Sequence, residues 1–404
     1  MTAPVKETRP SLPEGWRRVR LGDICRVVSG STPSTNVPGY WDGDIVWITP
    51  TDLGRLTSRR IDASSRRITV QGYQNCGTEL VPVGSVILSS RAPIGHLGIA
   101  AVSLCTNQGC KSFVAGAEVD SDFLYFALKQ GVKALKALGS GATFAEVSKS
   151  QLENFQITMP PLPEQRRIAA DLHDQMAAVE RARVAAEAQL GAAEKLPAAY
   201  LREVFGSMQH KGLPKRRLGE ILQLRKEVIH PGDNAKGRTT FVGLEHIEST
   251  TGIRTGFADV EMAELTGRKP KFYQSDIVYG YLRPYLNKVW VAEFDGLCSV
   301  DQYVYSVTPE LANVEYVAWF MRSPTYLERA PINTTPGQLP RIRIDEVASV
   351  EIELPPLNQQ ETIVADLNRR FAAINKTYLA LQELHESMNE LPQALLQEAF
   401  SAAI

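Results

Sequence analysis

The chain has 404 residues, enough for two or three domains. Hydrophobic residues make up 44% of it and charged residues 22%, which is ordinary for a soluble globular protein. The formal net charge of −1 excludes a generally basic protein, so any surface for nucleic acid must be local.

The sequence contains no apolar run long enough to cross a membrane, and its start, MTAPVKETRPSLPEGW, lacks the apolar core of a signal peptide. The cysteines have no metal-ligand spacing, and they fit free thiols in a reducing compartment. They are Cys25, Cys76, Cys105, Cys110 and Cys298. We therefore expect a cytoplasmic protein with no metal site of its own.

Residues 13–158 form the first predicted globular unit. We expect a strand at Ile45–Thr49, a loop at Pro50–Asp52 and then an arginine-rich stretch at residues 59–67. Strand-forming residues alternate with glycines in residues 81–102, which predicts a hairpin.

A helix is expected next, at Ser121–Leu138, with Ser121 as its N-cap. A loop at residues 139–148, a short helix and a closing strand complete the unit. Together these elements predict an α/β domain.

Residues 159–207 are predicted to be one long helix, entered from the proline pair at 160–161. Apolar residues recur at steps of three and four and form a narrow stripe, which favours the seam of a helix pair. Pro197 should kink or break this helix.

The second half of the chain repeats the first. Residues 211–353 follow the plan of the first unit with a diverged sequence, and residues 354–404 repeat the helix closely, with Pro392 in place of Pro197. Adding 195 to the residue number pairs the helices without a gap: Gln165 with Gln360, Leu172 with Leu367, Leu201 with Leu396 and Phe205 with Phe400. A repeat of this length indicates a duplicated domain-plus-helix unit, and the diverged domains predict two similar tasks on two different targets.

The sequence offers little that points to catalysis. It contains no GxxxxGK[ST] phosphate loop and no GxGxxG after a strand, and its six histidines are scattered. No pair of carboxylates has a spacing that supports acid–base catalysis. This favours a binding or scaffolding role.

Basic and amide side chains in both predicted domains are of the kinds that contact DNA, because arginine and lysine bind phosphates and arginine, asparagine and glutamine read base edges. The alternative is that most of them are merely solvated or that, like Gln108 and Gln302, they support loop backbone. The candidates in the first domain are Arg59, Arg60, Arg66, Arg67, Arg91, Asn107 and Lys111. Those in the second are Arg254, Arg268, Lys269, Lys271, Arg283, Lys288, Gln338, Arg341 and Arg343. Arg91 and Arg283 are expected in comparable strand-end loops, and we predict that both approach DNA. The equal alternative is a structural arginine paired with a nearby carboxylate.

The chain resembles the specificity subunits of type I restriction-modification systems over nearly its whole length. The resemblance lies in the helix entries PPLPEQRRIAADL and PPLNQQETIVADL and in the helix ends LPAAYLREVF and LPQALLQEAF. The RLGDI and RLGEI openings, the strand GSVILSSRAPIG and the loop GSGATFAEVSKSQL also match.

This resemblance implies an α/β fold with two target-recognition domains, separated by two long antiparallel coiled-coil helices in an internal pseudo-twofold repeat. The boundaries would be 13–158, 159–207, 211–353 and 354–404. It implies a non-catalytic subunit that reads a split, asymmetric site on double-stranded DNA, with the helices as a ruler for the unread spacer. Two methyltransferase subunits and the restriction subunits would be its partners, and S-adenosylmethionine, ATP and magnesium would bind to those partners.

We also expect the outer faces of the helix ends to need cover from a partner, because apolar residues gather there. They are Leu201, Val204, Phe205, Leu395, Leu396 and Phe400. Two alternatives remain open from the residues: a coiled-coil adaptor whose domains bind protein, and an enzyme with an unrecognised site. A salt-dependent gel shift would exclude the adaptor, and turnover by the pure chain would support the enzyme.

Overall fold

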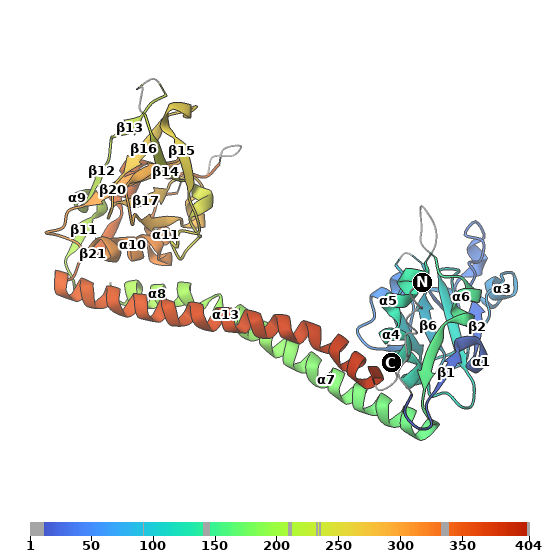
Figure 1. Ribbon diagram of the computed structural model, residues 1–404. Helices are drawn as coiled ribbons and strands as arrows, with labels where there is room; N and C mark the ends of the chain where they lie inside the picture. The colour runs from blue at the N-terminus through green and yellow to red at the C-terminus, as the bar shows by residue number, and fades with distance from the viewer. Residues whose placement is uncertain are drawn as a thin grey trace, which may run out of the picture. The chain divides into compact units, whose positions relative to one another are not determined.

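The computed structural model describes residues 12–91, 93–139, 146–208, 212–231, 233, 236–332 and 339–401. The chain divides into two compact units (Figure 1). Unit 1 comprises residues 1–185 and 385–404, and unit 2 comprises residues 186–384. The long helices α7 (Leu162–Ala193) and α13 (Leu357–Ser401) each contribute to both units.

Unit 1 contains a five-stranded sheet in the order β2-β9-β6-β7-β4, a three-stranded sheet β5-β3-β8 and the pair β1-β10. Its strands are β1 (Arg17–Arg20), β2 (Cys25–Ser29), β3 (Trp41–Ile48), β4 (Arg60–Ile61), β5 (Arg66–Ile68), β6 (Val86–Ser89), β7 (Leu97–Ala100), β8 (Leu104–Thr106), β9 (Cys110–Ala115) and β10 (Gln156–Met159). The predicted strand at 45–49 is the second half of β3, and the predicted hairpin is the antiparallel pair β6–β7.

The central strand β6 shows why the five-stranded sheet is buried on both faces. Successive side chains of a strand point to opposite faces. Val86 and Leu88 lie in the hydrophobic cluster that includes α4, whereas Ile87 lies in the cluster shared with the three-stranded sheet. The buried run VILS therefore belongs to a strand covered on both sides.

The helical segments of unit 1, apart from α7, are α1 (Leu21–Ile24), η1 (Pro38–Tyr40), α2 (Pro50–Gly54), α3 (Val70–Gln74), α4 (Ser121–Gln130), α5 (Val132–Leu138) and α6 (Lys149–Asn154). Two sequence predictions were wrong in detail. The expected loop at 50–52 is the start of α2, because Thr49 and Asp52 form a reciprocal capping box. The expected helix at 121–138 is interrupted at Gly131, and its N-cap is Asp120, whose carboxylate accepts hydrogen bonds from two backbone N–H groups. Residues 140–145 of the predicted loop lie outside the described residues.

Unit 2 repeats this arrangement with a four-stranded sheet β12-β20-β17-β18, a five-stranded sheet β13-β16-β19-β14-β15 and the pair β11-β21. Its strands are β11 (Lys215–Arg217), β12 (Leu222–Leu224), β13 (Val228–Ile229), β14 (Arg238–Val242), β15 (Ala258–Glu261), β16 (Lys269–Phe272), β17 (Ile277–Gly280), β18 (Val289–Val291), β19 (Gly296–Cys298), β20 (Gln302–Val307) and β21 (Glu351–Glu353). Its helical segments are α8 (Leu196–Met208), α9 (Leu218–Ile221), η2 (Leu244–His246), η3 (Met262–Glu264), η4 (Pro284–Leu286), α10 (Val314–Arg322), α11 (Pro324–Arg329) and α12 (Ile344–Ser349). The α/β fold class and the internal repeat are thus confirmed.

A buried glutamine at the start of each long helix explains part of the repeated sequence. The Gln165 side chain accepts a hydrogen bond from the backbone N–H of Asp120 at 2.9 Å and donates to the carbonyls of Glu118 and Pro160 at 3.0 and 2.9 Å. Gln360 accepts from Asn313 N–H at 2.8 Å and donates to two carbonyls in the same way. Each amide therefore fastens a long helix to the N-terminus of a domain helix, α4 in unit 1 and α10 in unit 2.

The two prolines act differently in the helices. The first helix is interrupted between Ala193 and Leu196, just before Pro197, as predicted. Pro392 lies inside α13 and does not end it. Within unit 2 the helices pair antiparallel, because Tyr200 hydrogen-bonds to Asp366 while Tyr378 lies 3.3 Å from Glu194.

The apolar helix ends are core residues, which overturns their prediction as outer, partner-binding faces. In unit 2, Leu201 and Phe205 of α8 are buried, and the Phe205 ring lies 5.6 Å from those of Tyr316 and Phe320. In unit 1, Leu396 and Phe400 of α13 are buried, and Phe400 lies 5.6 Å from Phe123.

Val204 and Leu395 are half-buried against the same two clusters. The apolar stripe predicted that these faces need cover, but the chain's own domains supply it.

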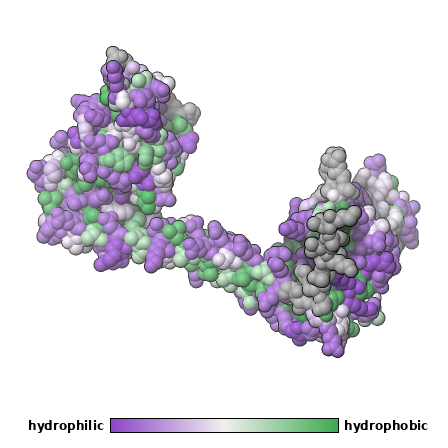
Figure 2. Space-filling model, in the orientation of Figure 1, coloured by the Kyte–Doolittle hydropathy of each residue, from purple (hydrophilic) through white to green (hydrophobic). Residues whose placement is uncertain are grey.

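Other apolar side chains of the long helices are exposed to solvent. Figure 2 shows hydrophobic residues among hydrophilic ones along the helical part of the visible face. Those at least 38% exposed are Val184, Leu196, Leu379, Leu384 and Leu391. Among the described residues, none of the helices has the length and apolar character needed to span a bilayer.

Candidate nucleic-acid interface

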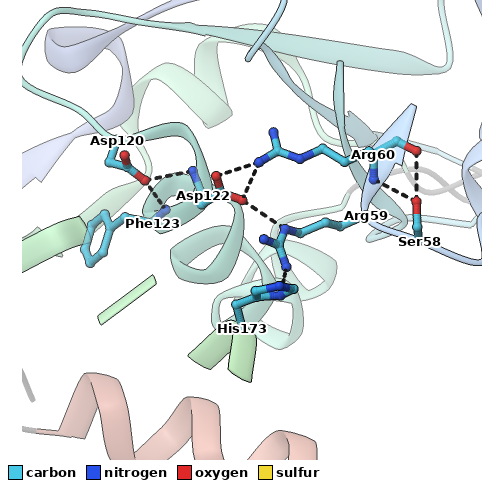
Figure 3. A network of polar contacts seen from close by, with 7 residues as sticks. All are labelled: Ser58, Arg59, Arg60, Asp120, Asp122, Phe123 and His173. Carbon is cyan, nitrogen blue, oxygen red and sulfur yellow. Dashed lines mark hydrogen bonds and ion pairs between the residues drawn. The ribbon is translucent and has the colours of Figure 1, made fainter. Parts of the chain in front are cut away.

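Arg60, the first residue of β4, and Arg59 just before it belong to a polar network within unit 1 (Figure 3). Their guanidinium groups reach the Asp122 carboxylate at 2.9 and 2.8 Å. Arg59 also donates to Nδ1 of His173 on α7, and because arginine is only a donor this nitrogen must accept. Arg59 therefore links the start of β4 to α4 and α7. The Arg60 side chain, in contrast, remains 45% exposed.

Arg66 and Arg67 lie on β5, an edge strand of the three-stranded sheet, and both are exposed. The Arg66 guanidinium lies 3.5 Å from the ring centre of Trp41, which in turn packs edge-on against Trp47 at 5.2 Å. Stacking on an aromatic face leaves the edge of a guanidinium free to donate hydrogen bonds. The Trp41–Arg66 pair, with Arg67 beside it, is therefore well built to contact DNA.

Lys111 is the candidate that fits a DNA contact least. Its side chain is only 7% exposed, and its ammonium lies 3.2 Å from the Gln108 carbonyl and 3.5 Å from Glu146. Asn107 accepts a hydrogen bond from Gly109 N–H at 2.9 Å and so supports the same loop. The structural alternative describes both residues better, since the Lys111 ammonium and the Asn107 side-chain oxygen are engaged inside the domain.

In unit 2, a stacked pair of tyrosines lies within the electrostatic influence of Arg268 and Arg341, which come from separate segments. The rings of Tyr281 and Tyr303 lie 4.3 Å apart at 19°. Burial, and next Asp301, raise the pKa of Tyr281, and nearby Arg268 and Arg341 act against that rise. We call this group, with the adjacent Arg283, the tyrosine–arginine cluster.

The backbone holds the cluster together. Arg283 N–H donates to the Pro340 carbonyl at 2.7 Å, and Leu282 forms a β-bridge with Arg341. Arg283 has a φ of +52°, a region that a residue with a side chain rarely adopts. Its guanidinium is exposed, as are those of Arg268, Arg341 and Arg343.

The predicted equivalence of Arg91 and Arg283 needs a one-residue correction. Arg91 forms a β-bridge with Glu146, as Leu282 does with Arg341, so Arg91 corresponds to Leu282. The Arg91 guanidinium lies 3.9 Å from the Glu146 carboxylate, a loose ion pair that leaves it partly exposed. Counted from the equivalent strands β6 and β17, the arginine of unit 2 stands one position later than Arg91, with no insertion before it.

The remaining candidates of unit 2 are packed against aromatic rings or carbonyls. Arg254 pairs with Glu293 at 2.9 Å and lies over Phe294. Lys269 lies over Phe241, Lys271 over Tyr273, and Lys288 donates to the Leu244 carbonyl at 2.6 Å. Gln338 lies outside the described residues.

Comparison with known proteins places the whole chain. A family model described as "Type I restriction modification DNA specificity domain" matches residues 13–186. A curated relative, the type I restriction enzyme MjaIX specificity subunit of Methanocaldococcus jannaschii, is 27% identical over 96% of this chain and 94% of the relative. The chain belongs to the specificity subunits of type I restriction-modification systems.

Further relatives agree. The EcoDI specificity subunit of Escherichia coli is 24% identical, over 70% of each chain. Among solved structures, this specificity subunit is similar to a chain from work on assembly and conformational transition of the type I R-M system (TM-score 0.71, 21% identity, 97% and 99% covered). It is also similar to the HsdS subunit of Thermoanaerobacter tengcongensis (TM-score 0.67, 20% identity, 98% and 99% covered). These two structural likenesses support the fold.

As a specificity subunit the chain is non-catalytic, and its task is sequence-specific DNA recognition. The sequence reasoning missed the aromatic members of the candidate interface. Arg66 lies on the ring of Trp41, and the stacked rings of Tyr281 and Tyr303 lie within the electrostatic influence of arginines in unit 2. The run YGYLRPY was the signal, since closely spaced tyrosines flank an arginine next to a proline.

Proposed function

We propose that this specificity subunit reads a bipartite, asymmetric site on double-stranded DNA, one half with each recognition domain, and directs partner subunits to it. The observation that carries the proposal is a repeated scaffold with two different surfaces. The Gln165 and Gln360 contacts are the same in both units, whereas the basic–aromatic groups differ. Two different reading surfaces on one scaffold suit two different half-sites.

We assign base reading to the Trp41–Arg66 pair with Arg67 in the first domain and to the tyrosine–arginine cluster in the second. An arginine held on a rigid aromatic ring, as Arg66 is on Trp41, is pre-organised for bidentate contacts to guanine, and the exposed arginines of the second cluster are available for the same contacts. The Arg59 tie to Asp122 and His173 is assigned to support of the domain instead.

We further propose that two methyltransferase subunits, and with them restriction subunits, bind this chain and carry S-adenosylmethionine, ATP and magnesium. The exposed apolar residues of the long helices support a protein partner there, since such residues in a group favour burial at an interface. Leu379 and Leu384 replace the buried helix ends as the expected contact. A DNA partner also favours the cytoplasm as the place of action.

The test of the function is methylome sequencing of cells with and without this gene. We expect adenine methylation at a motif of two short half-sites around an unread spacer, present only with the gene. A gene deletion that leaves every methylated motif unchanged would contradict the proposal.

The partner surface has its own test. Leu379→Asp/Leu384→Asp should lose capture of the recombinant methyltransferase subunit while thermal stability stays close to wild type, because both side chains are exposed. The control is Phe400→Leu, which alters the core of unit 1 and should lower the melting temperature instead. Normal capture by the double variant would exclude this surface.

A further inference from the structure

A groove of about 1090 Å³ lies in unit 1, lined by α5, β10 and the last turns of α13. Its charged lining residues are all cations: Arg18, Lys129, Lys133 and Lys136. Among the described residues, no carboxylate lines it, although the whole chain carries one more acidic than basic residue. The groove is therefore a local basic surface on a nearly neutral protein.

These cations have no acidic partner among the described residues, and Arg18, Lys133 and Lys136 are exposed. Lys133 and Lys136 are three residues apart on α5, so they lie on one face of that helix. Their like charges repel each other, which favours an anion that bridges them. Glutamine side chains complete the polar lining, from Gln130, Gln156, Gln393 and Gln397.

The repeat provides an internal comparison. Arg18 pairs with Thr158 in the β1–β10 ladder, and Lys215 pairs with Glu353 at the same place in the β11–β21 ladder. The Glu353 carboxylate lies 3.8 Å from Lys215 and 2.9 Å from Arg329. The cation Lys215 of unit 2 is therefore ion-paired, whereas its counterpart Arg18 in unit 1 has no acidic partner among the described residues.

A second position behaves in the same way. Counted from the helix N-caps, Gly131 of α5 and Ser323 of α11, Lys136 corresponds to Glu328. Glu328 forms an ion pair with Arg202 at 3.0 Å, whereas the counterpart of Arg202 in unit 1 is the uncharged Gln397. The two units therefore share a fold at this place, but individual substitutions in the groove lining give it a different charge in unit 1.

We propose that this groove of unit 1 binds the sugar–phosphate backbone of double-stranded DNA, and that unit 2 lacks its open cations at the two positions compared above. The proposal rests on the proposed function and adds a sequence-independent contact to it. Ammonium groups bind phosphates as point charges, and glutamine amides donate to phosphate oxygens without reading bases. A duplex presents one negative charge per about 1.7 Å, so it offers a line of charges to cations spread over β1, α4 and α5.

The test measures how the affinity of the full-length chain depends on salt. A fluorescein-labelled 40-base-pair duplex of scrambled sequence would be titrated between 50 and 300 mM KCl. Each phosphate contact contributes about −0.9 to the slope of log K against log salt. The Lys133→Gln/Lys136→Gln variant should therefore have a slope about 1.8 less steep than wild type.

Two further variants sharpen the result. Thr158→Glu recreates the arrangement of unit 2 and should engage Arg18, with a slope about 0.9 less steep. Lys226→Gln/Lys376→Gln removes the same charge from exposed lysines outside the groove and should keep the wild-type slope. Melting temperatures within a few degrees of wild type would show that the variants fold.

The outcomes separate the groove from the function as a whole. Wild-type slopes for both groove variants would overturn the groove while leaving DNA recognition intact. A slope that changes equally in the Lys226/Lys376 control would overturn it as a general charge effect. Loss of methyltransferase capture with an unchanged slope would assign the groove to an acidic protein instead. If the wild-type chain shows no salt-dependent DNA binding, the proposed function itself fails.

Discussion

At the scale of single residues, the left-handed backbone of Arg283 allows its effect on folding stability to be measured apart from its effect on DNA binding. An L-residue in this conformation costs about 1–2 kcal/mol, a strain that glycine does not have. We expect Arg283→Gly to keep or raise the free energy of unfolding by up to about 1 kcal/mol, and Arg283→Ala to leave the strain in place. Both should weaken binding by about 1–3 kcal/mol, because both remove the guanidinium.

The loss should concern only one half-site. Anisotropy titrations on duplexes mutated in one half at a time would show relaxed discrimination in the half read by the second domain. Arg66→Ala is the matched variant for the first domain. Wild-type affinity and discrimination in both variants would show that these arginines do not read bases, and an equal loss on all sequences would make them phosphate contacts.

At the scale of elements, the two buried glutamines should be equivalent. Replacing either by methionine keeps the unbranched shape but leaves a backbone N–H and two carbonyls without their partner, at about 1–3 kcal/mol. For units of this size we expect the melting temperature to fall by about 2–4 °C per kcal/mol. Gln175→Met and Gln359→Met, at exposed positions of the same helices, should have little effect. Unequal losses at Gln165 and Gln360 would show that the repeat is not energetically symmetric.

The helices and strands also show which features of the fold could be predicted from the sequence. The long helices, the hairpin and the break near Pro197 followed from periodicity and proline chemistry. The burial of Phe205 and Phe400 did not, because a stripe shows that a face needs cover without showing what covers it.

The partners of individual side chains could not be predicted from the sequence either. Arg59 looks like Arg66 in the sequence, yet one lies between Asp122 and His173 and the other on Trp41. Such partners come from segments far apart in the chain, so spacing alone could not assign them.

At the scale of the whole molecule, α7 and α13 both pass from one unit to the other, at residues 185–186 and 384–385. If they set the unread spacer, both must change together, since an insertion in one helix alone would be opposed by the other. Four added residues in each, at these two places, lengthen the helices by about 6 Å and nearly keep the seam's facing. We expect the spacer to grow by about one to two base pairs, at about 3.4 Å each, with unchanged half-sites.

Mapping methylated adenines in cells that express this variant with the proposed methyltransferase partner would measure both the spacer length and the half-site sequences. An unchanged spacer with full activity would refute the ruler. New half-site sequences would refute the division of labour between helices and domains.

The placement of Leu396 and Phe400 in the core of unit 1 has a consequence for biosynthesis. Residues 13–185 leave the ribosome long before residues 385–401, and about 200 residues at 5–20 per second take roughly 10–40 s. During that time the nascent first domain exposes the apolar surface around Phe123 that Phe400 will cover. Aggregation is avoided in this interval if a chaperone covers the surface or if the rest of the chain is translated faster than the nascent domain aggregates. A message truncated before residue 385 would yield a first domain whose apolar surface stays exposed.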